Sequence, residues 1–373
     1  MLTKKGLECR SDAIRSNSAL TDRRAFLKMA GAAWAATLAP GARFALAKTD
    51  ALFATAYQSR SGEFFVATVT EAGELIDSAP LPARSHGMSF CPVTGQAVAF
   101  ARRPGTYAMI FSPDRSTAPV VITTPPERHF FGHGCFSRDG RLLYATENDF
   151  AANRGMIGIY DATDGFARKG EFPTYGIGPH DMTLLNDGRM LVIANGGIET
   201  HPDFGRTKLN LSQMQPSLTL VDTDSGTLIE KHAMPDHLRQ LSTRHVDMDA
   251  KGRIWFACQY EGPRNDRPPL IGSFGYGDPL TFLTLPETTA DAMANYCGAI
   301  AVNRRENLVA ASSPKGGVSV IIDIATGTVR ETQQLAQVCG LSAAPRGFIT
   351  SSNEGTLGKT LSAVAWDQHI VQI

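Results

Sequence analysis

A unit of four short β-rich runs recurs about every 47 residues after residue 48, and this repeat limits the possible folds more than any other feature. Glycine, proline and aspartate turns separate the runs, whereas the periodicity of an amphipathic helix is nearly absent. The clearest run of the unit appears in seven copies, at residues 52–56, 97–101, 142–146, 190–194, 254–258, 308–312 and 348–352.

A single four-stranded sheet cannot bury both of its faces, so successive units must pack against one another. Four strands in roughly 40–50 residues, repeated in series, are typical of a β-propeller. The sequence therefore predicts an all-β fold, a seven-bladed β-propeller. The run that opens each unit is recognisable in only six copies. One blade is therefore either short or closed by an unrecognised strand, and a six-bladed or irregular propeller is the alternative.

The first 47 residues have the order of regions found in an export signal. Arg23-Arg24 is followed by Phe-Leu-Lys, then by an Ala/Gly-rich stretch and an A-x-A cleavage pattern at residues 45–47. We predict a twin-arginine signal peptide over residues 1–47, a single β-propeller domain over residues 48–373, and export of the folded protein to the periplasm. A buried N-terminal helix is the alternative.

Composition and motifs exclude several classes of protein. The 36 basic and 36 acidic side chains balance, which gives no case for a basic nucleic-acid-binding surface. No G-x-S-x-G, H-E-x-x-H, P-loop or G-x-G-x-x-G motif stands where its chemistry would need it. No apolar run reaches the roughly 18 residues needed to cross a bilayer. We therefore predict no nucleic-acid partner, no membrane span and no catalytic residue.

Histidine and cysteine recur at the start of the run that opens each unit. Four units carry a histidine there and the last two carry a cysteine: His86, His133, His180, His245, Cys297 and Cys339. The opening strand of a propeller blade normally lines the central channel, so these side chains are expected near one mouth of that channel. Imidazole and thiolate are ligands for zinc, copper and iron.

This recurrence predicts a metal site formed by His86, His133 and His180 from neighbouring blades, with His245 as a further candidate ligand. The metal is unknown, with iron or copper as the candidates. The alternative is that each histidine only forms hydrogen bonds to the next blade. Cys297 and Cys339 fit small buried residues better than ligands.

Loops that leave the second strand of each unit are expected at the same mouth. A polar insertion at residues 195–217 lengthens one of them, and its His201, Arg206 and Lys208 could capture an anion or close over the channel. Packing between two blades is the alternative for this insertion. The full candidate face for a ligand or partner comprises Arg103, Glu147, Asn148, Asn195, His201, Arg206, Lys208, Cys297 and Cys339.

Several long motifs resemble those of one bacterial family, the domain-of-unknown-function 1513 family. They are Asn-Gly-Gly-Ile-Glu-Thr-His-Pro at residues 195–202, Arg-Ser-His-Gly at 84–87, Phe-Ala-Arg-Arg-Pro-Gly at 100–105 and Ala-Thr-Glu-Asn-Asp at 145–149. The resemblance implies a seven-bladed periplasmic propeller exported by the twin-arginine route. It also implies partners among imelysin-like and di-haem oxidoreductase-like periplasmic proteins, and a place in iron acquisition. It supplies no catalytic residues.

Three functions follow from these observations. The leading hypothesis is a non-enzymatic periplasmic propeller that binds a transition metal, or a metal-handling protein partner, in iron acquisition. The second is a metal-dependent enzyme, either a lactonase-type hydrolase or an oxidoreductase, for which Glu147 and Asn148 beside the histidines are the supporting feature. The third is a pure protein-interaction scaffold.

Overall fold

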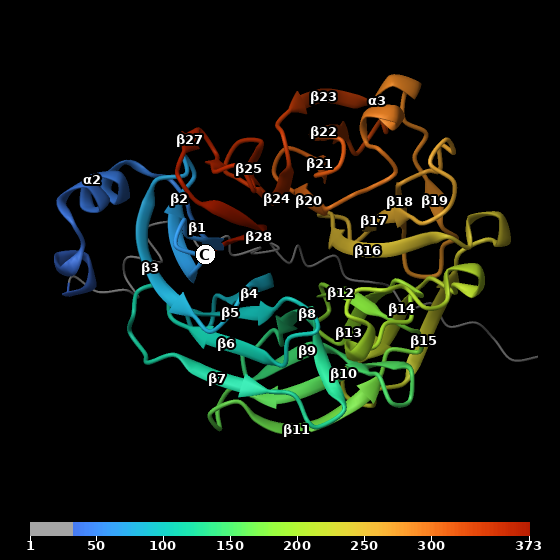
Figure 1. The fold of residues 1–373 in the computed structure, drawn as a ribbon, viewed down its shortest axis with the longest axis horizontal. Coiled ribbons are helices and arrows are strands. Elements are labelled where there is room, and N and C mark those ends of the chain that lie inside the picture. Colours follow the sequence, from blue (N-terminus) through green and yellow to red (C-terminus); the bar gives the residue numbers. More distant parts are fainter. Residues whose placement is uncertain (1–32) are drawn as a thin grey trace, which may run out of the picture.

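Seven four-stranded antiparallel sheets stand around a central axis in the computed structural model, which describes residues 33–373 (Figure 1). The innermost strands of adjacent blades contact one another all the way around the ring. The predicted all-β, seven-bladed propeller is therefore confirmed, and the six-bladed or irregular alternative is wrong.

Six blades use four consecutive strands each, and the first strand of each blade is the innermost. The second blade contains β4 (Ser85–Cys91), β5 (Gln96–Ala101), β6 (Tyr107–Phe111) and β7 (Val120–Thr123). The third contains β8 (Arg128–Phe136), β9 (Leu142–Asp149), β10 (Arg154–Asp161) and β11 (Ala167–Pro173). The fourth contains β12 (Pro179–Leu184), β13 (Met190–Asn195), β14 (Ser217–Asp222) and β15 (Leu228–Ala233).

The last three consecutive blades follow the same order. The fifth contains β16 (Leu241–Met248), β17 (Ile254–Tyr260), β18 (Ile271–Phe274) and β19 (Thr281–Phe282). The sixth contains β20 (Ala299–Asn303), β21 (Leu308–Ser313), β22 (Val318–Asp323) and β23 (Val329–Gln334). The seventh contains β24 (Val338–Ala343), β25 (Phe348–Ser352), β26 (Thr356–Leu357) and β27 (Thr360–Leu361).

The first blade joins the two ends of the described chain. Its order is β28-β1-β2-β3, so the last strand supplies the innermost position (Figure 1). These strands are β28 (Ala365–Gln372), β1 (Leu52–Gln58), β2 (Phe64–Thr70) and β3 (Leu75–Leu81). The seventh opening strand, which could not be found next to its own repeat, is therefore β28.

Polar and aromatic contacts hold β28 in place. The Nε of Arg84, just before β4, donates to the buried Asp367 carboxylate over 2.8 Å, and the Ser85 hydroxyl donates to the same carboxylate over 3.1 Å. Trp366 is 3 % exposed, packs edge-on against Tyr57, and donates its indole N–H to the Gly355 carbonyl. The closing strand is thus tied to the blades on both sides of it.

The core lies between blades and is richest along the second strands. Val98 and Phe100 of β5, Leu191 of β13 and Phe256 of β17 are completely buried. A strand buried on both faces by neighbouring blades reads as a continuous apolar run, which is why these strands were the clearest part of the repeat.

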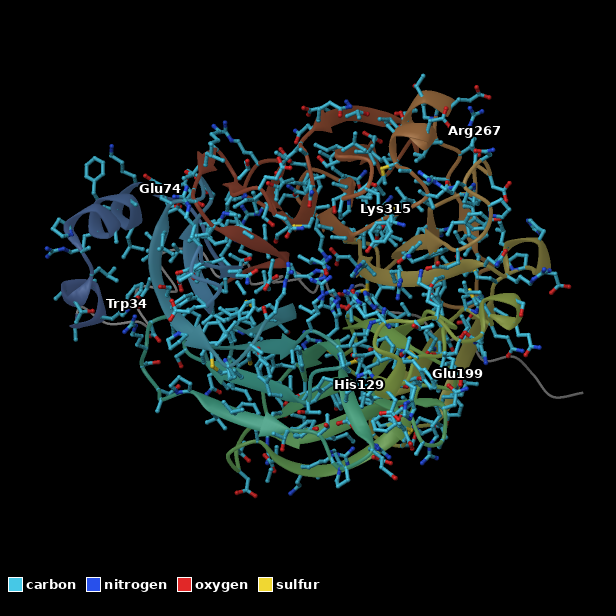
Figure 2. The ribbon with its side chains drawn as sticks, viewed as in Figure 1. Trp34, Glu74, His129, Glu199, Arg267 and Lys315 are labelled. Carbon is cyan, nitrogen blue, oxygen red and sulfur yellow. The ribbon has the colours of Figure 1, made fainter. Side chains whose placement is uncertain are left out.

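Short helices lie outside the sheets in the described part of the chain. They are α2 (Pro40–Lys48), α3 (Glu287–Ala292), η1 (Pro202–Phe204), η2 (Leu211–Gln213) and η3 (Asp236–Leu238). Trp34, at the outer edge in Figure 2, and Leu46 of α2 pack in one apolar cluster with Ile76 of β3. No helix among residues 33–373 is long and apolar enough to span a membrane.

The predicted signal peptide falls only partly on this structure. Arg23-Arg24 lies outside the described residues. The boundary at residue 47 falls within α2. The signal peptide and its cleavage remain predictions.

Replacing Trp366 with alanine tests the closure of the ring by β28. Loss of this buried side chain should lower the free energy of unfolding by about 3–5 kcal/mol. Leu361→Ala is the control, because Leu361 is 76 % exposed and its loss should cost no more than about 0.5 kcal/mol. Denaturant unfolding measures both values, and equal stability of the two variants would contradict a structural role for β28.

Candidate functional site

Five histidines gather in the central channel. His86, His133, His180 and His245 are joined by His369 of β28, and the centroids of neighbouring rings lie between 4.5 and 5.3 Å apart. Figure 2 shows nitrogen-rich side chains concentrated in the middle of the ring. The structure therefore brings together all four predicted histidines and adds a fifth.

The histidines do not share one position, which corrects the sequence analysis. In the fifth blade, His245 pairs with Ala257 and lies three residues before Met248, the last residue of β16 paired with β17. In the fourth blade, the residue three positions before the last pair of β12 and β13 is Asp181, not His180. Bulges in these strands shift the register by one residue in β4, β12 and β16 and by two residues in β8 and β28. Two layers result: a mouth layer of His86 and His180, and a deep layer of His133, His245 and His369.

Glycines in adjacent blades make room for the imidazoles. A Cβ on Gly132 would lie 2.5 Å from Cδ2 of His86, and a Cβ on Gly87 would lie 2.7 Å from Nδ1 of His133. Gly132 also has a φ of +109°, which side chains rarely adopt. The His-Gly pairs of the sequence therefore reflect close packing between the second and third blades.

Asp181 orients two histidines of the deep layer. Its carboxylate lies 3.0 Å from Nδ1 of His133 and 3.4 Å from Nδ1 of His245. Although burial opposes ionisation, these two rings hold the pKa of Asp181 well below its usual range. A carboxylate on Nδ1 fixes the tautomer and leaves Nε2 free to act as a ligand, the arrangement common in metal sites.

Several ring nitrogens have no hydrogen-bond partner among the described residues. Nε2 of His133, Nε2 of His369 and Nδ1 of His86 are buried and unpaired. Buried polar atoms are nearly always bonded, so unpaired ones in a cluster call for an explanation.

The environment of four of these imidazoles favours the neutral form. Burial, reinforced by neighbouring histidines, lowers the pKa of His86 and of His369 well below the usual value. Burial and the adjacent Arg244 do the same to the pKa of His180, and burial lowers the pKa of His245. A neutral imidazole is the form that binds metal ions.

Two trios of histidines have the spacing for a metal ion. The trio of His86, His133 and His180 and the trio of His133, His245 and His369 each place three nitrogens within 4.8 Å of one another. Bonds of about 2.1 Å allow two ligand nitrogens to be at most about 4.2 Å apart. Small ring rotations would therefore complete either site, and His133 belongs to both.

A cavity of about 360 Å³, here called the mouth cavity, opens above the mouth layer. A second cavity of about 330 Å³ lies against the deep layer, and His245 lines both. Six cationic side chains line the mouth cavity: Arg102, Arg103, Arg206, Lys208, Arg244 and Lys315. The loops after β5 and β21 and the 195–217 insertion therefore do meet at one mouth, as predicted.

Like charges and burial act on these arginines. Burial and nearby arginines lower the pKa of Arg102 to about 10 and that of Arg103 to about 9. Burial also lowers the pKa of Arg244, whose guanidinium donates to Gln259 over 2.8 Å. Arginine keeps its positive charge at neutral pH in proteins, so all three side chains are cationic.

Glu147 and Asn148 are not at the mouth, which corrects the prediction that placed them beside the histidines. Glu147 is fully buried within the third blade, where it accepts from the Tyr160 hydroxyl over 2.7 Å and from Arg168 over 2.9 Å. The Asn148 amide lies 3.1 Å from Nε2 of His129 and donates to the Thr200 carbonyl. Glu147 therefore ties strands of the third blade together, and Asn148 ties that blade to the 195–217 insertion.

Two further candidates of the face also have structural partners. The Asn195 amide donates to the Thr174 carbonyl and to the Thr219 hydroxyl, which fixes the start of the insertion. His201 packs edge-on against Phe150 and pairs with Asp203.

The two cysteines differ in position. Cys297 lines the mouth cavity, and burial raises its pKa to about 12. Cys339 is buried among backbone oxygens, and burial raises its pKa to about 11. Both thiols are free and protonated, which agrees with the prediction that they fit buried residues better than ligands.

Sequence reasoning missed His369, Asp181, Arg244 and Lys315 as site residues. The only signal for His369 was the missing seventh opening strand combined with an unassigned run at the C-terminal end. Asp181 was visible beside His180, but its role depends on a one-residue bulge that no pattern in the sequence indicates.

The architecture defines a seven-bladed β-propeller with a histidine-filled channel, and solved structures share that fold. Kuenenia stuttgartiensis hydrazine synthase matches at 12 % identity and a TM-score of 0.57, over 79 % of this chain and 91 % of that one. The Myceliophteria thermophila Cps50 (Swd1) β-propeller domain matches at 10 % identity and a TM-score of 0.56, over 80 % and 93 %. At these identities the likeness extends to the fold alone.

The chain belongs to the family described as "Protein of unknown function (DUF1513)", which matches residues 79–373. The resemblance seen in the sequence motifs is thereby confirmed. No curated protein matches the chain.

Gly132→Ala tests the close packing of the histidine layers. The added methyl group meets His86 and strains a positive φ, so the free energy of unfolding should fall by at least about 2 kcal/mol. Gly170→Ala is the matched control, because a Cβ at that strand glycine meets nothing within 4 Å. Denaturant unfolding compares the two, and an unaffected Gly132→Ala variant would show that the rings do not pack as described.

Proposed function

We propose that this protein is a non-enzymatic β-propeller that binds a transition metal ion among the histidines of its channel. The observation that carries the proposal is the cluster of five buried or half-buried imidazoles with unpaired nitrogens. Packing alone would be served better by apolar side chains, because unpaired buried polar atoms destabilise a protein.

The ligand chemistry supports iron or copper as the ion. Neutral imidazoles suit copper, iron and zinc, and the Asp181 carboxylate on His133 increases the basicity of the ligand. Most nitrogen sites bind Fe²⁺ more weakly than Zn²⁺, and Zn²⁺ more weakly than Cu²⁺. Copper should therefore bind most tightly in vitro. The metal carried in the cell is set by availability as well as by affinity.

His133→Gln tests the proposed metal site, because His133 belongs to both trios. Metal-free protein titrated with Cu²⁺, Zn²⁺ and Fe²⁺ in a calorimeter should bind one equivalent, and the variant should bind at least about 100-fold more weakly. His180→Gln and His369→Gln each remove one trio and therefore identify the ion's position.

His237→Gln is the control, since His237 is exposed and lies in η3. Near-ultraviolet circular dichroism must show that all variants keep the native packing. Unchanged metal binding in His133→Gln, or less than one equivalent of metal bound by the native protein, would contradict the metal proposal. The protein-interaction scaffold would then be the better explanation.

The enzymatic alternatives lack their supporting feature. Glu147 and Asn148 were the residues that favoured a lactonase-type hydrolase, and both have structural partners inside the third blade and its loops. No second candidate function is therefore proposed.

We further propose that the protein acts in the periplasm, with imelysin-like or di-haem oxidoreductase-like proteins as partners in iron acquisition. The twin-arginine pattern at Arg23-Arg24 and the family resemblance support this setting. Because this route exports folded proteins, the metal ion could be bound in the cytoplasm before export.

Replacing Arg23 and Arg24 with lysine tests the proposed route. The doubly substituted precursor should stay in the cytoplasm, because the export machinery recognises the arginine pair. Fractionation followed by immunoblotting measures this. The control is Arg43→Lys, which leaves the pair intact, and periplasmic recovery of the double variant would contradict the proposal.

A further inference from the structure

The mouth cavity carries a second site that the metal proposal does not use. Within the described part of the chain, its lining includes six cationic side chains and no carboxylate. They come from four blades: Arg102 and Arg103 follow β5, Arg206 and Lys208 lie in the insertion, Arg244 lies in β16, and Lys315 follows β21. The charge therefore converges on one space from separate parts of the ring.

Most of this charge has no counter-charge. Lys208 forms an ion pair with Glu261. Among residues 33–373, none of Arg102, Arg103, Arg206, Arg244 and Lys315 has a carboxylate within ion-pair distance. Gathering like charges at a half-buried site is costly unless an anion completes it.

Unpaired donors point to the same conclusion. Nε of Arg102 and Nη1 of Arg103 are buried and have no acceptor among the described residues. The Arg103 guanidinium lies over the Phe131 ring, at 5.0 Å from its centroid, which holds it in place. Arg244, which is 6 % exposed, is fixed by its bond to Gln259. The donors are therefore positioned before any ligand arrives.

We propose that the mouth cavity binds a small, multiply charged oxyanion, either a di- or tricarboxylate or a phosphate-bearing compound. Guanidinium groups pair with carboxylate and phosphate through two parallel hydrogen bonds. A volume of about 360 Å³ suits a small molecule rather than a polymer. Tyr296, Gln259 and Gln368 supply further polar atoms around it.

Most of the cations of the mouth cavity lie apart from the histidines of the proposed metal site. Among residues 33–373, His86, His180 and His245 are the members of the histidine cluster that also line the cavity. Arg244 is the cation that touches the cluster, since its Nη1 lies 3.5 Å from Nδ1 of His180. An anion bound here would also cover the mouth layer of the cluster. The insertion would contribute through Arg206, which is exposed on its loop.

Calorimetric titration of the metal-free full protein with citrate, inorganic phosphate and acetate tests the inference. Citrate or phosphate should bind at least about tenfold more tightly than acetate, because only they engage several cations at once. The tighter of the two identifies the polycarboxylate or the phosphate class. Equal, weak binding of all three anions would overturn the inference.

Three variants locate the site. Arg103→Gln and Arg206→Gln should each weaken binding by about tenfold or more, and the exposed Arg206 keeps the test valid if Arg103→Gln fails to fold. Arg346→Gln, exposed elsewhere on the surface, should change the affinity less than about twofold.

His133→Gln separates this inference from the metal proposal. It should weaken metal binding at least about 100-fold and leave anion binding unchanged, because His133 does not line the mouth cavity. Anion binding that appears only in metal-loaded protein, or that survives Arg206→Gln undiminished, would overturn the inference.

Discussion

The antiparallel pairing of β28 with β1 joins the two ends of the propeller, and every side chain in the channel depends on it. An open ring of six and three-quarter blades would expose the inner face of the first blade and leave the channel without one wall. The pairing also delivers His369, which is in contact with three other histidines. Ring closure and site assembly are therefore one event in this fold.

The site combines two layers of imidazoles with a cationic chamber above them. Bulges of one or two residues place His86 and His180 toward the mouth, and His133, His245 and His369 deeper. Among the residues that the structure describes, Asp181 is the single carboxylate within ion-pair distance of the five histidines. It contacts His133 and His245 of the deep layer. The channel thus offers imidazole nitrogens in the histidine cluster and positive charge in the mouth cavity. These two sites suit either one ligand with two chemically different parts or two separate ligands.

Much of this architecture was predictable from the sequence, because blade repeats leave a strong pattern. Strands such as Met190–Asn195 are buried on both faces and read as continuous apolar runs. The convergence of histidines was predictable for the same reason, since equivalent strands face the same channel. Arg206 and Lys208 were also expected at the mouth, and the structure places both there.

The rest depended on features that a linear pattern does not record. Bulges moved neighbouring histidines into different layers, and the C-terminal strand crossed to the first blade with His369. Glu147 was expected in a loop after a strand, but β9 continues through it to Asp149, and its side chain bonds to Arg168 and Tyr160 within the blade. Side-chain direction at strand ends is decided by such local partners rather than by position in the repeat.

X-ray absorption spectroscopy of the copper-loaded or zinc-loaded protein tests the central claim most directly. The account predicts at least three nitrogen neighbours at about 2.0–2.1 Å, with the outer-shell scattering of imidazole rings and its loss in His133→Gln. A first shell of oxygen alone, without imidazole scattering, would place the metal outside the histidine cluster and contradict the account.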